Sequence, residues 1–260
     1  MESKLLKWLS NFYIVFVFLF IYIPIVVIII YSFNVSKSNA VWNGFTLQWY
    51  SKLFQNDNVL LALKNSLTVA VLSTGISTII GTIGAVGLYK YTFKGKGLID
   101  MLLYIPIVIP EIIMGISLLV YFSSMHMEFG IFTLVLSHTT FCIPFVFVTV
   151  KARLAGFDHS IEDAAMDLGA NKLTVFRTIT LPIILPGVLS GAMLAFALSL
   201  DDVIINFFVS GPESTTLPIK IFSMLRFGLS PEINALCSVM LLTTFIVLVF
   251  SQSIKLNKAK

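Results

Sequence analysis

Six long apolar runs, separated by short polar segments, dominate the pattern of this chain. Each run has about 20 residues or more, the length that an α-helix needs to cross the hydrocarbon core of a membrane, and none contains a Lys or Arg. The pattern therefore predicts transmembrane helices over the approximate ranges 12–33, 65–89, 98–122, 130–150, 187–210 and 233–254.

The composition agrees with this pattern. Of the 260 residues, 57% are hydrophobic and only 12% are charged, which is more apolar surface than a soluble domain of this length can keep from water. The fold class that follows is all-α, with one polytopic membrane domain over residues 1–260 and no soluble domain attached. The first run is too long for the apolar core of a secretory signal, so we expect an uncleaved first span.

The positive charges predict the orientation of the spans. With both termini in the cytoplasm, twelve of the seventeen Lys and Arg residues lie inside, as the positive-inside rule requires, and the five outside are Lys37, Lys52, Lys64, Lys220 and Arg226. The polar segment 160–182 is then cytoplasmic. This topology accounts for the net charge of +4, which is therefore no indication of nucleic-acid binding.

The segment 160–182 carries the signals of a short helix. Ser160 followed by Asp163 is typical of a capping box, and Gly169 can end the helix in a left-handed turn. Apolar residues share one face at the spacing i, i+3, i+4 and i+7, namely Ile161, Ala164, Ala165 and Leu168. Because two of these are alanines, the apolar stripe is shallow and favours close contact with a partner protein. The alternative is a solvated cytoplasmic helix.

Acidic side chains lie well inside the predicted spans at Glu111, Asp201 and Asp202. A carboxylate at the centre of a membrane helix costs roughly 3 kcal/mol on insertion scales, and no predicted span offers a Lys or Arg as partner. We therefore expect a partner subunit or the substrate to supply the cation. The alternative is a structural site that is hydrated near the outer interface. Small residues at four-residue spacing, from Gly187 to Ser199, form a face that leads toward Asp202.

The chain lacks the motifs of an enzyme. The cluster 94–97 does not have the spacing of a phosphate-binding loop, so any ATP is expected to bind to another chain. Cys142 and Cys237 lie far apart in sequence and indicate neither a disulfide framework nor a zinc site. We expect no cofactor and no metal. His138, in the fourth predicted span, is interpreted as a packed, hydrogen-bonded side chain rather than a ligand.

The order of residues in the segment 160–182 resembles the EAA loop of the permeases of ABC importers. That resemblance rests on an acidic residue and two alanines, a glycine four residues later, and a final Ile-x-Leu-Pro at 179–182. It implies a coupling helix that docks in a groove of an ATPase homodimer, through Asp163, Ala164, Ala165 and Gly169. It also implies a second homologous permease subunit and an extracytoplasmic binding protein. The first position is Asp here and Glu in the family, which conserves the charge.

Further stretches resemble the polyamine branch of these importers, which carries spermidine and putrescine across the bacterial inner membrane. They are Gly44-Phe45-Thr46 with Trp49-Tyr50, Ile109-Pro110-Glu111, Ser137-His138, Ser199-Leu200-Asp201-Asp202 and Ser230-Pro231-Glu232. The resemblance implies that an extracytoplasmic polyamine-binding protein delivers the substrate. A flexible polycation is bound by carboxylates and aromatic faces. The expected substrate path therefore consists of Glu111, Asp201, Asp202, Ser199 and, near the outer mouth, Trp49.

Three other functions remain open from the sequence alone. The first is an ABC permease for another solute, such as a metal, a phosphonate or thiamine. The second is an ion-coupled secondary transporter that uses the same carboxylates for protons, which the EAA-like loop and the lack of a visible inverted repeat disfavour. The third is a structural membrane subunit without transport, which has no need of acids inside its spans.

Overall fold

The computed structural model describes residues 4–36, 41–158, 160–226, 228 and 230–257, and the burial of side chains in this part of the chain from residue 7 to 246. Within these ranges the chain is helical, and its one β-type contact is an isolated antiparallel bridge between Asn34 and Phe45. The predicted all-α class is confirmed. The chain divides into two compact units, Met1–Leu60 with Ile221–Lys260, and Leu61–Lys220.

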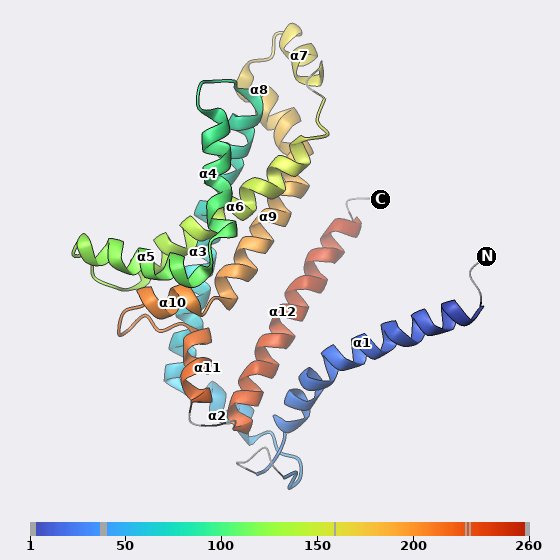
Figure 1. Cartoon of the computed structure of the whole chain (residues 1–260), viewed down its shortest axis with the longest axis vertical. Helices are drawn as coiled ribbons and strands as arrows, with labels where there is room; N and C mark the ends of the chain where they lie inside the picture. The colour runs from blue at the N-terminus through green and yellow to red at the C-terminus, as the bar shows by residue number, and fades with distance from the viewer. Residues whose placement is uncertain (1–3, 37–40, 159, 227, 229, 258–260) are drawn as a thin grey trace. The chain divides into compact units, whose positions relative to one another are not determined.

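The first unit is built from the two ends of the chain. Helix α12 (Pro231–Asn257) packs against α1 (Lys4–Tyr31) and against the short α2 (Gln48–Phe54). Figure 1 shows α1 and α12 approaching each other near α2 and diverging from there. The side chains of α1 are almost all exposed and apolar, as expected of a helix that contacts lipid. Helix α11 (Leu217–Leu225) connects this unit to the second one.

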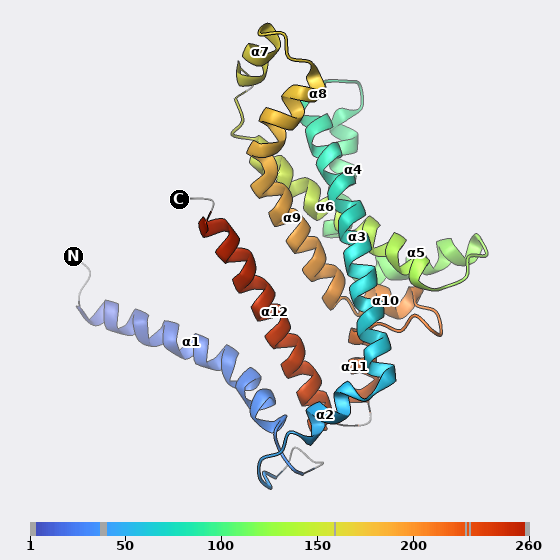
Figure 2. The ribbon, with the colours of Figure 1, turned by 180° about the vertical axis from the view of Figure 1, so that it is seen from behind.

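The second unit is organised around α6 (Ile131–Leu154), which packs against α4 (Lys96–Val108), α9 (Leu181–Asp201) and α10 (Ile204–Val209). Fully buried side chains of α6, among them Leu134 and Phe147, form much of its core. The long helix α3 (Asp57–Lys90) runs beside α9, and the Ser73 and Ser199 hydroxyl oxygens, 3.1 Å apart, join the two helices (Figure 2).

Small residues allow α3 and α9 to approach α6 closely, as the spacing from Gly187 to Ser199 predicts for α9. A Cβ atom added at Gly81 of α3 would lie 2.8 Å from Cβ of Val146, and one added at Gly187 of α9 would lie 2.8 Å from Cβ of Arg153. Both distances are too short for a real contact, so each position requires glycine. In a membrane such close backbone approach provides the van der Waals packing that holds helices together.

The third predicted span, 98–122, is a broken helix. Helix α4 ends at Val108, and α5 (Glu111–Ser124) begins after two intervening residues. The two helices meet at an angle of 106°, and the bend is visible in Figure 1. Pro110 has no N–H to continue the ladder and forces the preceding Ile109 into an extended conformation, with φ −68° and ψ 133°. Pro106, by contrast, lies within α4 without ending it.

The fifth predicted span, 187–210, is also divided. The continuous apolar helix covers Lys172–Asp201, including a short π-helical turn at Phe176–Thr180, and α10 follows as a separate element. Asp202 causes the break, because its backbone is extended and its carboxylate accepts the N–H groups of Ile205 and Asn206, at 3.2 and 2.9 Å. The acid thus caps the start of α10, and the prediction of one helix across 187–210 is wrong.

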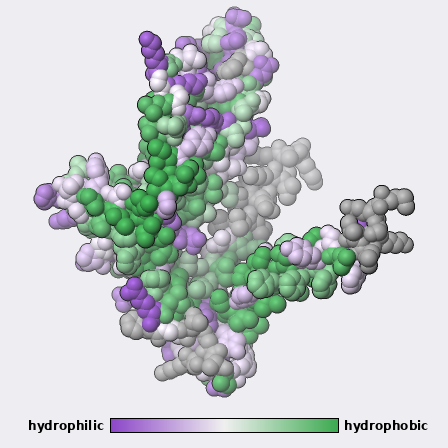
Figure 3. All heavy atoms as spheres, viewed as in Figure 1, coloured by the Kyte–Doolittle hydropathy of each residue, from purple (hydrophilic) through white to green (hydrophobic). Residues whose placement is uncertain are grey.

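By length and composition, four described helices can cross a membrane: Lys7–Tyr31, Asp57–Lys90, Ile131–Leu154 and Lys172–Asp201. The bent α4–α5 pair gives up to one more, and α12 has an apolar part at Pro231–Ile246. The count of six spans stays a prediction, and Lys37, Lys258 and Lys260 of the charge count lie outside the described residues. Hydrophobic side chains cover the flanks of α4 and α5 in Figure 3, whereas hydrophilic ones gather at the end that carries residues 160–175.

Candidate functional site

The first candidate site is an acid cluster formed by Glu111, Asp201 and Asp202. Glu111 opens α5 directly after the Pro110 break, and Asp201 ends α9. Because α5 packs against α10, the two breaks of the second unit come together. The Glu111 carboxyl lies close enough to Asp202 and Asp201 to interact electrostatically with both. The structure therefore brings together the three acids that the sequence analysis selected.

The three acids differ in their surroundings. Asp201 is exposed, Glu111 is half-buried, and only 5% of Asp202 is accessible. Besides capping α10, Asp202 faces His138, whose Nε2 lies 3.4 Å from its Oδ2, a contact that is ionic when the imidazole is protonated. The expectation that another subunit or the substrate supplies the cation stays a prediction, and the structure adds His138 of the same chain as a residue that faces Asp202.

Ser199 is buried beside the acid cluster rather than open to it. Its hydroxyl lies 2.7 Å from Nδ1 of His138 and 3.1 Å from the hydroxyl of Ser73. His138 itself is completely buried, which confirms its interpretation as a packed, hydrogen-bonded side chain. Ser199 is therefore linked to Asp202 through the imidazole ring.

Trp49 belongs to the first unit, on α2, and its surroundings are those of a packed side chain. The ring is 5% exposed, its indole N–H donates to the Asn34 carbonyl at 2.7 Å, and the Lys52 ammonium lies 4.8 Å from the ring centroid. A cation of the same chain thus already occupies the aromatic face. These contacts favour a role for Trp49 in packing α2 against the residues around Asn34.

The second candidate site is the helix α7 (Ser160–Asp167) with the residues that follow it. Gly169 has φ +88°, its N–H donates to the Met166 carbonyl, and the N–H of Ala170 donates to the Ala165 carbonyl. These two bonds form a Schellman cap, so the predicted left-handed stop at Gly169 is confirmed. At the other end the Asp158 carboxylate accepts the Ser160 N–H at 2.9 Å, which makes Ser160 the first helical residue instead of the cap.

The apolar stripe of α7 is open to solvent. Leu168 is 90% exposed, Ile161 is 46% exposed, and Asp163 and Ala164 are also exposed. Within the described part of the chain only Ala165 of this stripe is half-buried, and a Leu that is nine-tenths exposed loses the free energy of burial. The stripe has the geometry of a docking surface.

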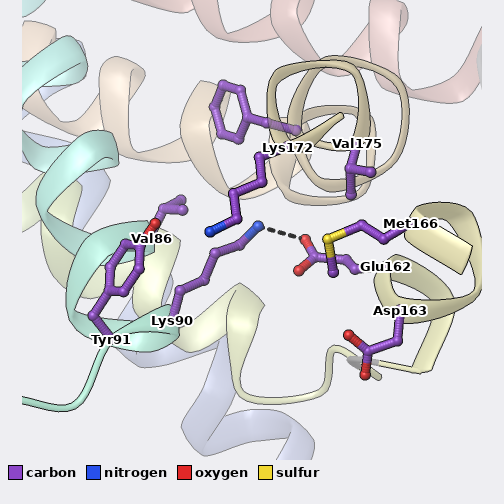
Figure 4. A pocket seen from close by; sticks show the side chains of 9 residues that line it. Val86, Lys90, Tyr91, Glu162, Asp163, Met166, Lys172 and Val175 are labelled. Atoms are coloured by element: carbon purple, nitrogen blue, oxygen red, sulfur yellow. Dashed lines mark ion pairs between the residues drawn. The ribbon is translucent and has the colours of Figure 1, made fainter. Parts of the chain in front are cut away.

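Glu162 holds α7 against the rest of the second unit. It is 5% exposed, its carboxylate lies 2.7 Å from the Lys90 ammonium at the end of α3, and it accepts a short hydrogen bond from the Thr180 hydroxyl. Figure 4 shows Lys90 and Lys172 entering the cavity of about 390 Å³ that Glu162 lines, with Asp163 at its edge. Neighbouring acids therefore have opposite roles, since Glu162 faces inward and Asp163 faces solvent.

Comparison with known proteins identifies the family. Residues 77–256 match the family described as "Binding-protein-dependent transport system inner membrane component". The chain belongs to this family of ABC-importer permeases. The permease is 46% identical over 229 residues to the spermidine/putrescine transport system permease protein PotC of Escherichia coli (strain K12), which covers 88% of this chain and 87% of that one. It is 45% identical over 218 residues to the putrescine transport system permease protein PotI of the same strain, covering 81% and 78%.

The fold of the permease also has a counterpart among solved structures. A chain from the crystal structure of a bacterial ABC transporter involved in the import of the acidic polysaccharide alginate superposes with a TM-score of 0.76, over 97% of this permease and 98% of that chain. The sequence identity is only 15%, so this likeness concerns the fold alone. The expectation of an ABC-importer permease, drawn from the EAA-like loop, is confirmed.

Two functional features of the permease escaped the sequence analysis. The Glu162–Lys90 pair was missed because the sequence analysis considered only the cap residues and the apolar stripe of this helix. A signal was available, since Lys90 directly follows an apolar run and faces the same side of the membrane in the predicted topology. The His138–Asp202 pair was missed because a search for Lys and Arg leaves out histidine, although both residues are ionisable positions within predicted spans.

Proposed function

We propose that this permease is the subunit of an ATP-driven importer that translocates polyamines such as spermidine and putrescine. The observation that carries the proposal is its 46% identity, over 88% of the chain, to a permease named for spermidine/putrescine transport. The acid cluster is the chemical feature that agrees with it. A polyamine is a flexible polycation, and Glu111 and Asp201 supply accessible carboxylates for its ammonium groups.

The substrate path in this proposal runs past the acid cluster at the two helix breaks. Irregular backbone inside a membrane is tolerated where it lines a cavity or is buried in protein, and discontinuous helices commonly mark such sites in transporters. Asp202 and Ser199 are both buried, so they lie behind the accessible acids and support the path from within the protein. Trp49 supports the first outer segment and is assigned no direct contact with the substrate.

The partners in this proposal follow from the family and from the exposed stripe. A second homologous permease subunit completes the path, and a polyamine-binding protein delivers the substrate from outside the cytoplasm. An ATPase homodimer binds the ATP. It also contacts α7 of the permease at Asp163, Ala164, Ala165 and Gly169. The exposed Leu168 and the capped end of the helix support this docking surface.

Uptake of labelled spermidine and putrescine tests the proposed function directly. Cells that carry the complete transporter should accumulate the label, and cells that lack only this chain should not. Labelled phosphonate and thiamine serve as controls for the rival solutes. Uptake of one of these in place of the polyamines would contradict the assignment, and uptake that persists when ATP is depleted but the proton gradient is kept would favour a secondary transporter.

The proposed orientation places both termini and α7 in the cytoplasm. Single cysteines at Lys94, Lys172 and Glu213, all exposed positions, report it when Cys142 and Cys237 are replaced by alanine. A thiol reagent that cannot cross the membrane should label only position 213 in intact cells, and all three positions after permeabilisation. Labelling of position 172 from outside would contradict the proposed orientation.

A further inference from the structure

A buried polar network surrounds His138 and joins four helices. It consists of Ser73 on α3, His138 on α6, Ser199 and Asp202 at the end of α9, and Asn206 on α10, and each of these residues is at most 5% exposed. Polar groups in such surroundings are costly unless they are fully hydrogen-bonded. The bonds within the network therefore determine how the acid cluster is held.

The hydrogen on Nε2 of His138 can be assigned from its neighbours. This nitrogen faces two acceptors, Oδ1 of Asn206 at 3.0 Å and Oδ2 of Asp202 at 3.4 Å. The orientation of the Asn206 amide is fixed in turn, because its Nδ2 donates to the Asp202 carbonyl at 2.6 Å. Nε2 must therefore carry a hydrogen.

The other nitrogen, Nδ1, faces a chain of groups that can reverse direction. The Ser199 hydroxyl lies 2.7 Å away, the Ser73 hydroxyl follows at 3.1 Å, and the Ala70 carbonyl ends the chain at 3.4 Å. If both hydroxyls donate toward Ala70, Ser199 accepts from Nδ1 and the ring is an imidazolium. If the Ser199 hydroxyl turns to donate to Nδ1, the ring is neutral. No heavy atom has to move, so the network accommodates a positive charge next to Asp202.

The charged and titratable groups around this pair are acidic or neutral. Glu111 of α5 and Asp201 of α9 interact with the same cluster, and the Cys142 thiol of α6 lies within electrostatic range of Asp202. Among the ion pairs that the described residues form, none brings a Lys or Arg to the cluster. In the interior of this chain His138 is therefore the counter-cation that geometry offers to Asp202.

We propose that His138 is a positioning residue of the substrate path, which holds Asp202 as a fixed internal anion at the break between α9 and α10. Asp202 then shapes the break and does not meet the substrate, whereas Glu111 and Asp201 are the carboxylates that contact its ammonium groups. This inference rests on the proposed function and divides the acid cluster into one structural and two contacting carboxylates.

The test is a double-mutant cycle on the assembled complex in proteoliposomes, with His138→Gln, Asp202→Asn and the double variant. His138→Gln leaves a buried carboxylate without its cation and should lower the maximal rate of spermidine uptake per complex about tenfold or more. The double variant removes both charges but keeps hydrogen-bonding amides, so its maximal rate should exceed that of His138→Gln. His126→Gln, at an exposed histidine, is the matched control and should have the wild-type rate.

Two further readouts separate the possible outcomes. Glu111→Gln should raise the KM for spermidine, whereas His138→Gln should act mainly on the maximal rate. The inference is overturned if His138→Gln has the wild-type rate, or if the loss in the double variant equals the product of the two single losses. In either case, spermidine uptake by the wild-type complex leaves the proposed function intact. If the wild type takes up no polyamine, the proposed function fails. The His138–Asp202 pair is then tested by the melting temperature of the complex. This temperature should be lower in His138→Gln than in the double variant.

Discussion

Glu111→Gln should lower spermidine uptake per assembled complex about ten- to a hundredfold at subsaturating substrate, while the amount of complex in the membrane stays unchanged. A charge-assisted hydrogen bond contributes about 1.5–3 kcal/mol, which corresponds to that range. Glu111 opens α5 at the helix break, is half-buried, and takes part in none of the ion pairs of the described chain. An ammonium group that enters the acid cluster stabilises the carboxylate form of Glu111 beside Asp201 and Asp202, and glutamine removes this charge while preserving the size of the side chain.

The same measurement on two other variants makes the result specific. Asp201→Asn should act in the same direction with a smaller loss, because Asp201 is exposed and its charge is screened by water. Glu128→Gln removes the same group from an exposed loop position and should leave uptake unaffected. If Glu111→Gln transports at the wild-type rate per complex, the acid cluster is not the cation path and the polyamine assignment loses its physical support.

Removal of either charge of the Glu162–Lys90 pair should uncouple the ATPase from this permease. Glu162→Gln or Lys90→Gln leaves one charge unpaired in a site where the side chains are only 7% and 22% exposed. Breaking a buried pair costs about 3 kcal/mol or more, which is enough to release α7 from α3 and from Thr180. Stimulation of ATP hydrolysis by the loaded binding protein should fall about tenfold in the reconstituted complex.

A charge exchange distinguishes a specific pair from general damage. The double variant Lys90→Glu with Glu162→Lys restores opposite charges at the same positions and should recover a large part of the stimulation. The matched control is the Lys151–Asp100 pair, 2.5 Å apart, whose side chains are 39% and 34% exposed. Lys151→Gln should change the stimulation little, because exposed pairs contribute about 0–1 kcal/mol. Equal losses in the two single variants and the exchanged variant would show that Glu162 acts through fold stability alone.

The features of this protein that depend on neighbouring residues could be predicted from its sequence. Long runs without charge predict membrane helices, because every backbone polar group in lipid must be bonded within the helix. Gly169 predicts the end of α7, because glycine adopts a positive φ without strain, and the small residues leading to Ser199 predict a face that packs closely on another helix. The break at Pro110 was not predicted, because Pro106 also lacks an N–H and restricts the residue before it, yet lies within α4 without ending it.

The environment of each acid was decided only by the tertiary structure. Asp201 and Asp202 are chemically identical neighbours, yet one is exposed and the other is buried against His138, because α9 ends between them and the chain turns into α10. Glu162 and Asp163 differ for a similar reason, since adjacent residues on a helix point about 100° apart and only Glu162 faces Lys90. Such pairings join residues that are distant along the chain, and local sequence periodicity carries no information about them.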